Sequence, residues 1–214
     1  MAMTERPILF SAPMVRAILA GNKMVTRRIL TPQPRREAQE LLSHPDLGGH
    51  FADHVFGYCM GKMGRHPYGV AGDRLWVREA FTYITGNGIR VHYRADGEPV
   101  GHDGAVLATE PGVRRWSPSI HMPRKLARIL LEVVSVRVEQ LHDIDELDAL
   151  AEGVEGKAVE GVLNGVPGTY ITGSARDEFA RLWDSINGKR GAWASNPWVW
   201  RVEFKRVDAQ TRAG

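Results

Sequence analysis

Residues 127–141, with the sequence ARILLEVVSVRVEQL, carry the strongest strand pattern in the chain. Val134, Val136 and Val138 alternate with polar residues along this stretch. β-Branched residues at every second position are typical of a strand with one buried face and one more polar face. The sequence therefore predicts a long strand here, and the other elements are expected to be arranged around a sheet that contains it.

Helix signals occur in three places. The first helix follows Ser11, which can cap its N-terminus, and it ends before Gly21. The second lies in DIDELDALAEGV, directly after the long strand, where Asp143 and Glu146 resemble a capping box. The third covers residues 174–188, where apolar side chains recur at helical spacing.

Further strands are predicted in GDRLWVRE, in GIRVHYRAD and in the closing stretch PWVWRVEFKRV, and residues 26–30 have some extended character. Excursions rich in glycine and proline cover residues 31–70 and 97–123, and residues 154–173 are glycine-rich and loop-like. Strands and helices do not alternate regularly. The expected fold class is therefore α+β, with a small, mostly antiparallel sheet or barrel, in one domain with long insertions.

Composition narrows the setting of the protein. The chain has 214 residues, a formal net charge of +3 and a pI of about 9.2, and arginine far outnumbers lysine. A basic, arginine-rich chain is compatible with a nucleic-acid partner but does not require one. Cys59 is the single cysteine, which favours a reducing compartment, and no apolar run is long enough for a membrane span. We expect a cytoplasmic protein with no membrane partner.

Several familiar chemistries are not indicated. The sequence has no GxxxxGK[ST] phosphate loop, no GxGxxG after a strand and no GxSxG elbow. Cys59 and eight scattered histidines give no pair at the ligand spacing of a zinc site. We therefore expect no metal and no cofactor.

The stretch GNKMVTRRIL, residues 21–30, concentrates the remaining candidates. Thr26 is a poor nucleophile until a base removes its proton, and Lys23 can act as that base only if burial or a nearby cation lowers its pKa. Arg27 and Arg28 could supply the cation. Glu152 ends the second helix, where the helix dipole mildly disfavours a carboxylate. From the residues alone, a solvated basic loop is the preferred interpretation, and a phosphate clamp or a Lys–Thr pair remains open.

Four segments together resemble ASCH-domain proteins of the PUA-like superfamily: GNKMVTRR after a short helix, GDRLWVRE, DIDELDALAEGV and NPWVWRVEFKRV. They are most similar to the larger members found in bacteriophages and prophages. The resemblance implies a small β-barrel with surrounding helices, and a cleft for RNA or a nucleobase. It implies a single domain over residues 1–207, with insertions near 35–67, 97–115 and 155–173 and a tail at 208–214.

The resemblance also implies a site. One branch of ASCH proteins hydrolyses N(4)-acetylcytidine with a lysine, a threonine three residues later and a glutamate before the final strands. Lys23, Thr26 and Glu152 match that pattern, although this chain is considerably larger and its paired arginines differ. The trio is expected to line one cavity, as the catalytic group of an amidohydrolase acting on an N-acylated nucleoside.

Ligand contacts are expected from arginines gathered on the cleft side, namely Arg27, Arg28, Arg78 and Arg124, together with Arg74 and Arg94. Two alternatives stay open because fold resemblance does not settle function. One is a non-catalytic RNA-binding module. The other is a phage accessory or assembly protein that uses the fold as a scaffold.

Overall fold

The computed structural model describes residues 3–34, 67–86, 88–98, 115–154, 158–163, 166–171 and 174–207. Most of the insertions expected near 35–67 and 97–115, the tail at 208–214 and Cys59 lie outside the described residues. Within the described part of the chain, no helix is long and apolar enough to cross a membrane.

The centre of the fold is a five-stranded, mostly antiparallel sheet with the strand order β1-β3-β6-β9-β2. Only β1 and β3 pair in parallel, and the other neighbours are antiparallel. Together with the helices, this sheet confirms the α+β class. The strands are β1 (Glu5–Leu9), β2 (Val25–Ile29), β3 (Arg74–Arg78), β6 (Leu130–Gln140) and β9 (Trp198–Arg206).

The closed barrel expected from the resemblance is not what the strands form, because the sheet is open, with β1 and β2 as its edges. No backbone ladder joins these two edges in the described residues. A side chain links them instead: Nη2 of Arg28 in β2 donates a hydrogen bond to the carbonyl oxygen of Leu9 in β1. The guanidinium group therefore takes the place of the backbone pairing that would close a barrel.

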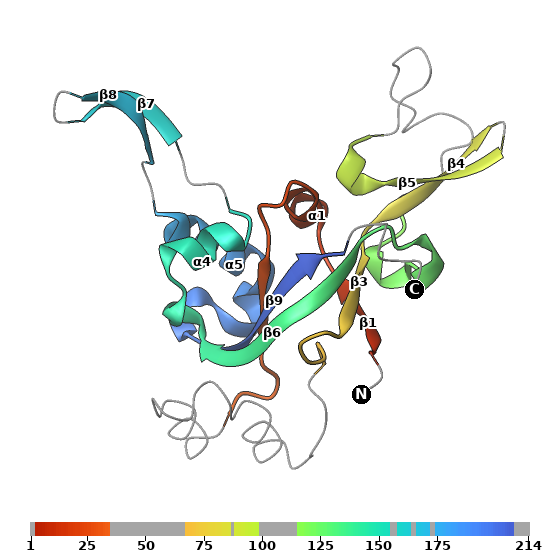
Figure 1. The fold of residues 1–214 in the computed structure, drawn as a ribbon, viewed down its shortest axis with the longest axis horizontal. Coiled ribbons are helices and arrows are strands. Elements are labelled where there is room, and N and C mark those ends of the chain that lie inside the picture. Colours follow the sequence, from red (N-terminus) through yellow and green to blue (C-terminus); the bar gives the residue numbers. More distant parts are fainter. Residues whose placement is uncertain are drawn as a thin grey trace.

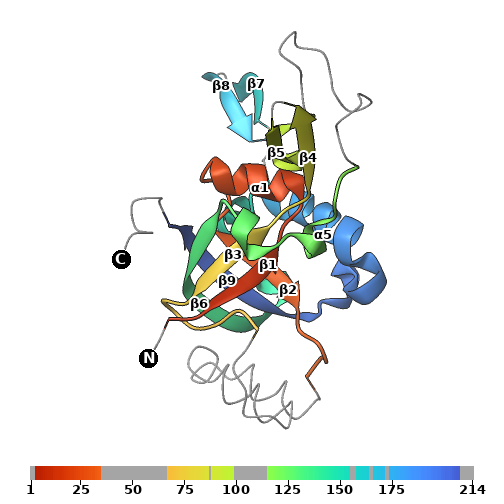
Figure 2. The same cartoon turned by 90° about the vertical axis from the view of Figure 1, so that its right-hand side faces the viewer.

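The helices and hairpins surround this sheet (Figure 1). Both hairpins extend beyond α1 at the same end of the molecule, as Figures 1 and 2 show. The helices are α1 (Ala12–Leu19), α4 (Glu146–Ala151) and α5 (Ala175–Gly191). The hairpins are formed by β4 (Phe81–Gly86) with β5 (Gly88–Tyr93), and by β7 (Ala158–Leu163) with β8 (Val166–Ile171). Short 3-10 turns are η1 (Arg94–Asp96), η3 (Ser119–His121), η4 (Arg124–Leu126), η5 (Leu141–Asp143) and η6 (Trp193–Ser195).

The β7–β8 hairpin corrects the expectation that residues 154–173 form a loop. Its two strands pair antiparallel over six residues each. The sequence between them is Asn-Gly, which is a strong signal for a two-residue hairpin turn. The glycine content of the segment obscured that signal.

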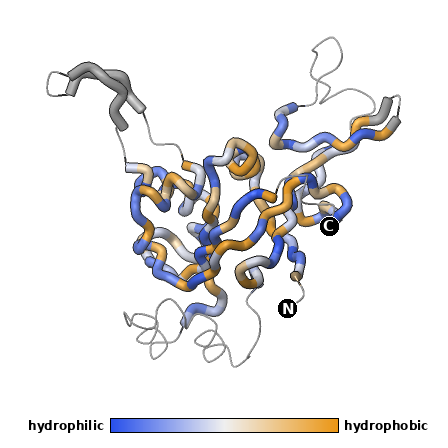
Figure 3. The backbone as a smooth tube through the Cα atoms, in the orientation of Figure 1, coloured by the Kyte–Doolittle hydropathy of each residue, from blue (hydrophilic) through white to orange (hydrophobic). Residues whose placement is uncertain are grey.

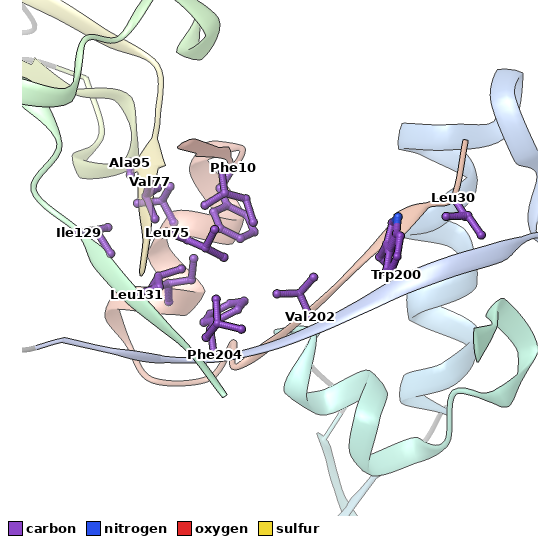
Figure 4. Packing of buried hydrophobic residues seen from close by; sticks show 14 of the residues in the cluster. Phe10, Leu30, Leu75, Val77, Ala95, Ile129, Leu131, Trp200, Val202 and Phe204 are labelled. Atoms are coloured by element: carbon purple, nitrogen blue, oxygen red, sulfur yellow. The ribbon is translucent and has the colours of Figure 1, made fainter. Parts of the chain in front are cut away.

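The main core lies on one face of the sheet, under α1. Phe204, Val202 and Trp200 follow one another along β9, and Figure 4 shows them extending from the group around Phe10 and Leu75 toward Leu30. In Figure 3, α1 and parts of the central strands are coloured as hydrophobic. The predicted alternation of β9 is thereby confirmed, since every second side chain of this strand belongs to the core.

A second core packs α4 and α5 against the opposite face of the sheet. Its buried members are Leu141, Ile144, Ala149, Ala175, Phe179, Trp183 and Val199. Helix α4 is capped by Asp145, whose side chain accepts a hydrogen bond from the backbone N–H of Asp148 at 2.7 Å, so the predicted Asp143–Glu146 box is wrong. A capping box is present one turn earlier, between Gln140 and Asp143 at η5.

Candidate functional site

The connection from α1 to β2 places Lys23 against the end of α4. Gly21 adopts a positive φ of 80°, and the carbonyl of Ala17 accepts the backbone N–H groups of both Asn22 and Lys23. A residue with φ in this region is most easily glycine, so the tight turn depends on Gly21. Lys23 then forms an isolated antiparallel bridge with Glu152. Two segments that are 129 residues apart in the sequence therefore meet through their backbones.

The side chains of Lys23 and Glu152 form a buried ion pair. Lys23 Nζ lies 2.6 Å from Glu152 Oε2 and 2.8 Å from the Glu152 carbonyl oxygen. The exposed fractions of the two side chains are 0% and 4%. Burial lowers the pKa of Lys23, and the nearby Arg28 and Arg27 act in the same direction, while Glu152 opposes them. The neutral amine is therefore more accessible than in an ordinary lysine.

Arg27 does not face a ligand as the sequence analysis expected. Its side chain has no exposed surface and is held by three carboxylates. Nε donates to Glu139 Oε1 at 2.8 Å, Nη1 lies 3.4 Å from Glu152 Oε1, and Nη2 pairs with Asp148. Because its donors are directed at protein carboxylates, Arg27 belongs to the structural support of Glu152.

Further ion pairs extend this network of charged side chains across the sheet. Its positive and negative side chains are nearly equal in number. Arg201 Nη2 donates to Asp148 Oδ1 at 2.8 Å, and Nη1 donates to Glu203 at 3.0 Å. Arg137 Nε donates to Glu139 Oε2 at 2.9 Å. Partial burial would raise the pKa of Asp148, but Arg201 and Arg27 hold that pKa below its ordinary value. Arg201 and Arg27 therefore stabilise the ionised form of Asp148.

Thr26 lies on the face of β2 opposite to Arg27. It pairs in register with Val202, which is fully buried in the main core, and its own exposed fraction is 2%. Side chains at every second position of a strand share a face, so Thr26 and Arg28 point to the same side. The hydroxyl of Thr26 has no hydrogen-bond partner among the described residues.

The ring of Phe10 lies close to Lys23 and also to Arg28, which shares its face of β2 with Thr26. Arg28 Cζ lies 5.3 Å from the ring centroid, and Lys23 Nζ lies 5.9 Å from the same centroid. The structure therefore brings Lys23 and Glu152 into contact and places Thr26 in the strand that carries Arg28. Among the described residues, the side chains of Thr26 and Lys23 form no hydrogen bond with each other.

Arg78 and Arg124 lie elsewhere, around Trp76. Their guanidinium carbons are 4.9 Å and 6.0 Å from the Trp76 ring, and Arg124 also pairs with Glu5 at 2.9 Å. Trp76 belongs to a small separate cluster with Leu130 and Val207. The arginines proposed for ligand binding therefore do not form one patch: Arg27 is internal, Arg28 is beside Phe10, and Arg78 and Arg124 flank Trp76.

A cleft of about 550 Å³ lies next to Phe10. Lys23, Thr26 and Glu152 are not among its lining residues, and Phe10 is the residue that the cleft shares with the Lys23 and Arg28 contacts. Sequence reasoning missed Phe10, Glu139, Asp148 and Arg201. For Glu139, Asp148 and Arg201, the only signal in the sequence was a charged side chain on the more polar face of a strand or helix.

Gly153 fixes the packing behind the ion pair. It has a φ of +82°, and a Cβ placed there would lie 2.8 Å from Ala17 Cβ and 3.0 Å from Lys23 Cβ. Gly21 has a similar φ of +80° but open space around it. We expect Gly21→Ala to lower the free energy of unfolding by about 1–2 kcal/mol through backbone strain alone.

Gly153→Ala should cost about 1–3 kcal/mol more than Gly21→Ala, because it adds overpacking against Lys23 to the same strain. Urea denaturation of the two variants measures the difference. Equal losses would show that Lys23 is not packed closely against Gly153.

Comparison with family models, with curated proteins and with solved structures gives no match for this chain. Among the described residues, no group of three or more His, Cys, Asp and Glu side chains could hold a metal ion.

Proposed function

We propose that the chain is an ASCH-type protein of the PUA-like superfamily that hydrolyses the acyl amide of an N-acylated cytidine through Lys23, Thr26 and Glu152. The observation that carries this proposal is the buried ion pair between Lys23 and Glu152. It joins the segment before β2 to the end of α4, the two places from which the resemblance takes its lysine and glutamate. The five-stranded sheet itself is open, and Arg28 joins its two edge strands through one hydrogen bond.

The reaction begins at Thr26. Its oxygen attacks the acyl carbon of the substrate while its proton passes to the neutral amine of Lys23. The C–N bond then breaks, the departing amine takes up a proton, and the acyl group remains on Thr26 as an ester. A water molecule hydrolyses the ester and returns the free hydroxyl.

Glu152 carries protons and positions the base. Its carboxylate accepts a hydrogen bond from Lys23 Nζ at 2.6 Å, and this contact directs the amine. Arg27 Nη1 approaches its other oxygen at 3.4 Å, so the carboxylate lies between the Lys23 amine and the Arg27 guanidinium group. The substrate is neutral at the acyl group, so these charges serve the proton transfers and not its binding.

The rate should depend on pH through Lys23. Because only the neutral amine accepts the proton of Thr26, kcat/KM is expected to rise with pH and to level off at an inflection below the ordinary lysine value of 10.5. Steady-state rates across the pH range that the fold tolerates measure this. Glu152→Gln removes the opposing carboxylate charge and should move the inflection further down in pH. An inflection that is unchanged by Glu152→Gln would contradict the role of the pair.

A non-catalytic RNA-binding module is the second candidate. The observation that favours it is that the Lys23 ammonium group already donates two short hydrogen bonds to Glu152. Such a pair can serve stability alone. This candidate predicts ligand binding without turnover, and a graded loss of affinity for Arg28→Ala.

A further inference from the structure

The cleft beside Phe10 has polar walls that the proposed reaction does not use. It is formed where α1 begins, and its lining includes Ser11, Arg16, Arg94 and Ser119. Its volume of about 550 Å³ lies within the range of small-molecule sites. The cleft is therefore large enough for the sugar and phosphate of a nucleotide.

Two arginines of the cleft are exposed and have no carboxylate partner among the described residues. Arg16, which lies one turn into α1, donates only to the carbonyl oxygen of Ala95, at 3.4 Å. Arg94 has only a contact with the ring of Trp116, at 5.8 Å from its centroid. Glu98 is the acidic residue of the lining, so the two guanidinium groups leave the cleft positive.

The N-terminus of α1 makes the electrostatic potential in the cleft more positive. The first turn of α1 contains no acidic residue, and the side chain of Ser11 makes no capping hydrogen bond. Backbone N–H groups at a helix start are donors without partners in the helix. Ser11, Ala12 and Pro13 at this helix start line the same cleft as Arg16 and Arg94.

We propose that this cleft binds the phosphate group of the substrate nucleotide, with Arg16 and Arg94 as its ligands, so that the protein acts on a nucleoside phosphate in preference to a free nucleoside. The proposal rests on the proposed function for the identity of the nucleoside. Phe10 lines the cleft, and its ring centroid also lies 5.3 Å from Arg28 Cζ and 5.9 Å from Lys23 Nζ, so the cleft adjoins the base of the proposed reaction.

The test compares the binding of cytidine and cytidine 5′-monophosphate to the full chain by calorimetry. We expect the monophosphate to bind at least about tenfold more tightly, a difference of about 1.4 kcal/mol. Arg16→Ala with Arg94→Ala should remove this advantage and leave cytidine binding unchanged. Arg90→Ala, on the exposed strand β5 and outside the cleft lining, is the matched control and should keep the advantage.

The outcomes separate this proposal from the proposed function. Equal affinity for cytidine and its monophosphate, or an advantage that survives the double variant, would overturn the phosphate site even if the protein hydrolyses acylated cytidine. A phosphate advantage that depends on Arg16 and Arg94, in a protein that hydrolyses nothing, would support the site and leave the hydrolytic proposal refuted.

Discussion

Thr26→Ala abolishes the hydrolysis of N-acylated cytidine while the affinity for the ligand stays within a few-fold of the unmodified protein. The substitution removes the attacking oxygen and leaves the Lys23–Glu152 pair untouched, since Thr26 contributes no hydrogen bond to that pair. We expect kcat to fall by about 100-fold or more, which is the usual effect of removing a group that acts only in the transition state. Product formation by mass spectrometry and binding by calorimetry give the two quantities.

Two further substitutions control for packing at this buried position. Thr26→Val keeps the shape of the side chain and removes the hydroxyl, so it should be as inactive as alanine. Thr26→Ser keeps the hydroxyl and should retain substantial activity. A Thr26→Val variant with normal turnover would show that the threonine is not the nucleophile.

Arg27→Met lowers the free energy of unfolding by about 3–5 kcal/mol, because it leaves the buried carboxylate of Glu139 and the partly buried carboxylate of Asp148 with fewer partners. The arginine side chain has no exposed surface and is bonded to both acids. Urea denaturation measures the effect. Activity should fall as well, since Arg27 also holds Glu152.

Arg137→Met is the matched control, because Arg137 also pairs with Glu139 but its side chain is 46% exposed. An exposed pair contributes about 0–1 kcal/mol, so this variant should be nearly as stable as the unmodified protein. Similar losses for the two variants would mean that burial does not distinguish the two arginines.

Local patterns in the sequence predicted much of the fold. The alternation along β9 and the helix after Ser11 are found as expected. The alternation of β6 is interrupted by a register shift between Val133 and Ser135, which leaves Val134 43% exposed. A bulge inserts a residue without changing the letters around it, so periodicity alone does not reveal it.

Strand β1 was also missed, because it is short and contains Pro7. Proline lacks the N–H of a sheet ladder, yet an edge strand tolerates it. The order β1-β3-β6-β9-β2 puts this strand at an edge, which only the complete topology reveals.

The candidate site depends on pairs that are far apart in the chain. Arg27 and Asp148 are 121 residues apart, and Arg27 and Glu139 are 112 residues apart. Composition and residue spacing carry no information on contacts between residues so far apart. The ion pairs of Arg27 could therefore not be foreseen, and its side chain was expected to contact a ligand. Lys23 and Glu152 were linked only through the resemblance, and their contact in the structure is independent geometric support for pairing them.

The most direct test is incubation of the purified chain with a panel of acylated nucleosides and their 5′-monophosphates, followed by mass spectrometry of the products. If Thr26 is the nucleophile, an N-acylated cytidine derivative loses its acyl group in the presence of the unmodified protein and not in the presence of Thr26→Val. A protein that binds cytidine derivatives but leaves every acyl group in place after long incubation would contradict it.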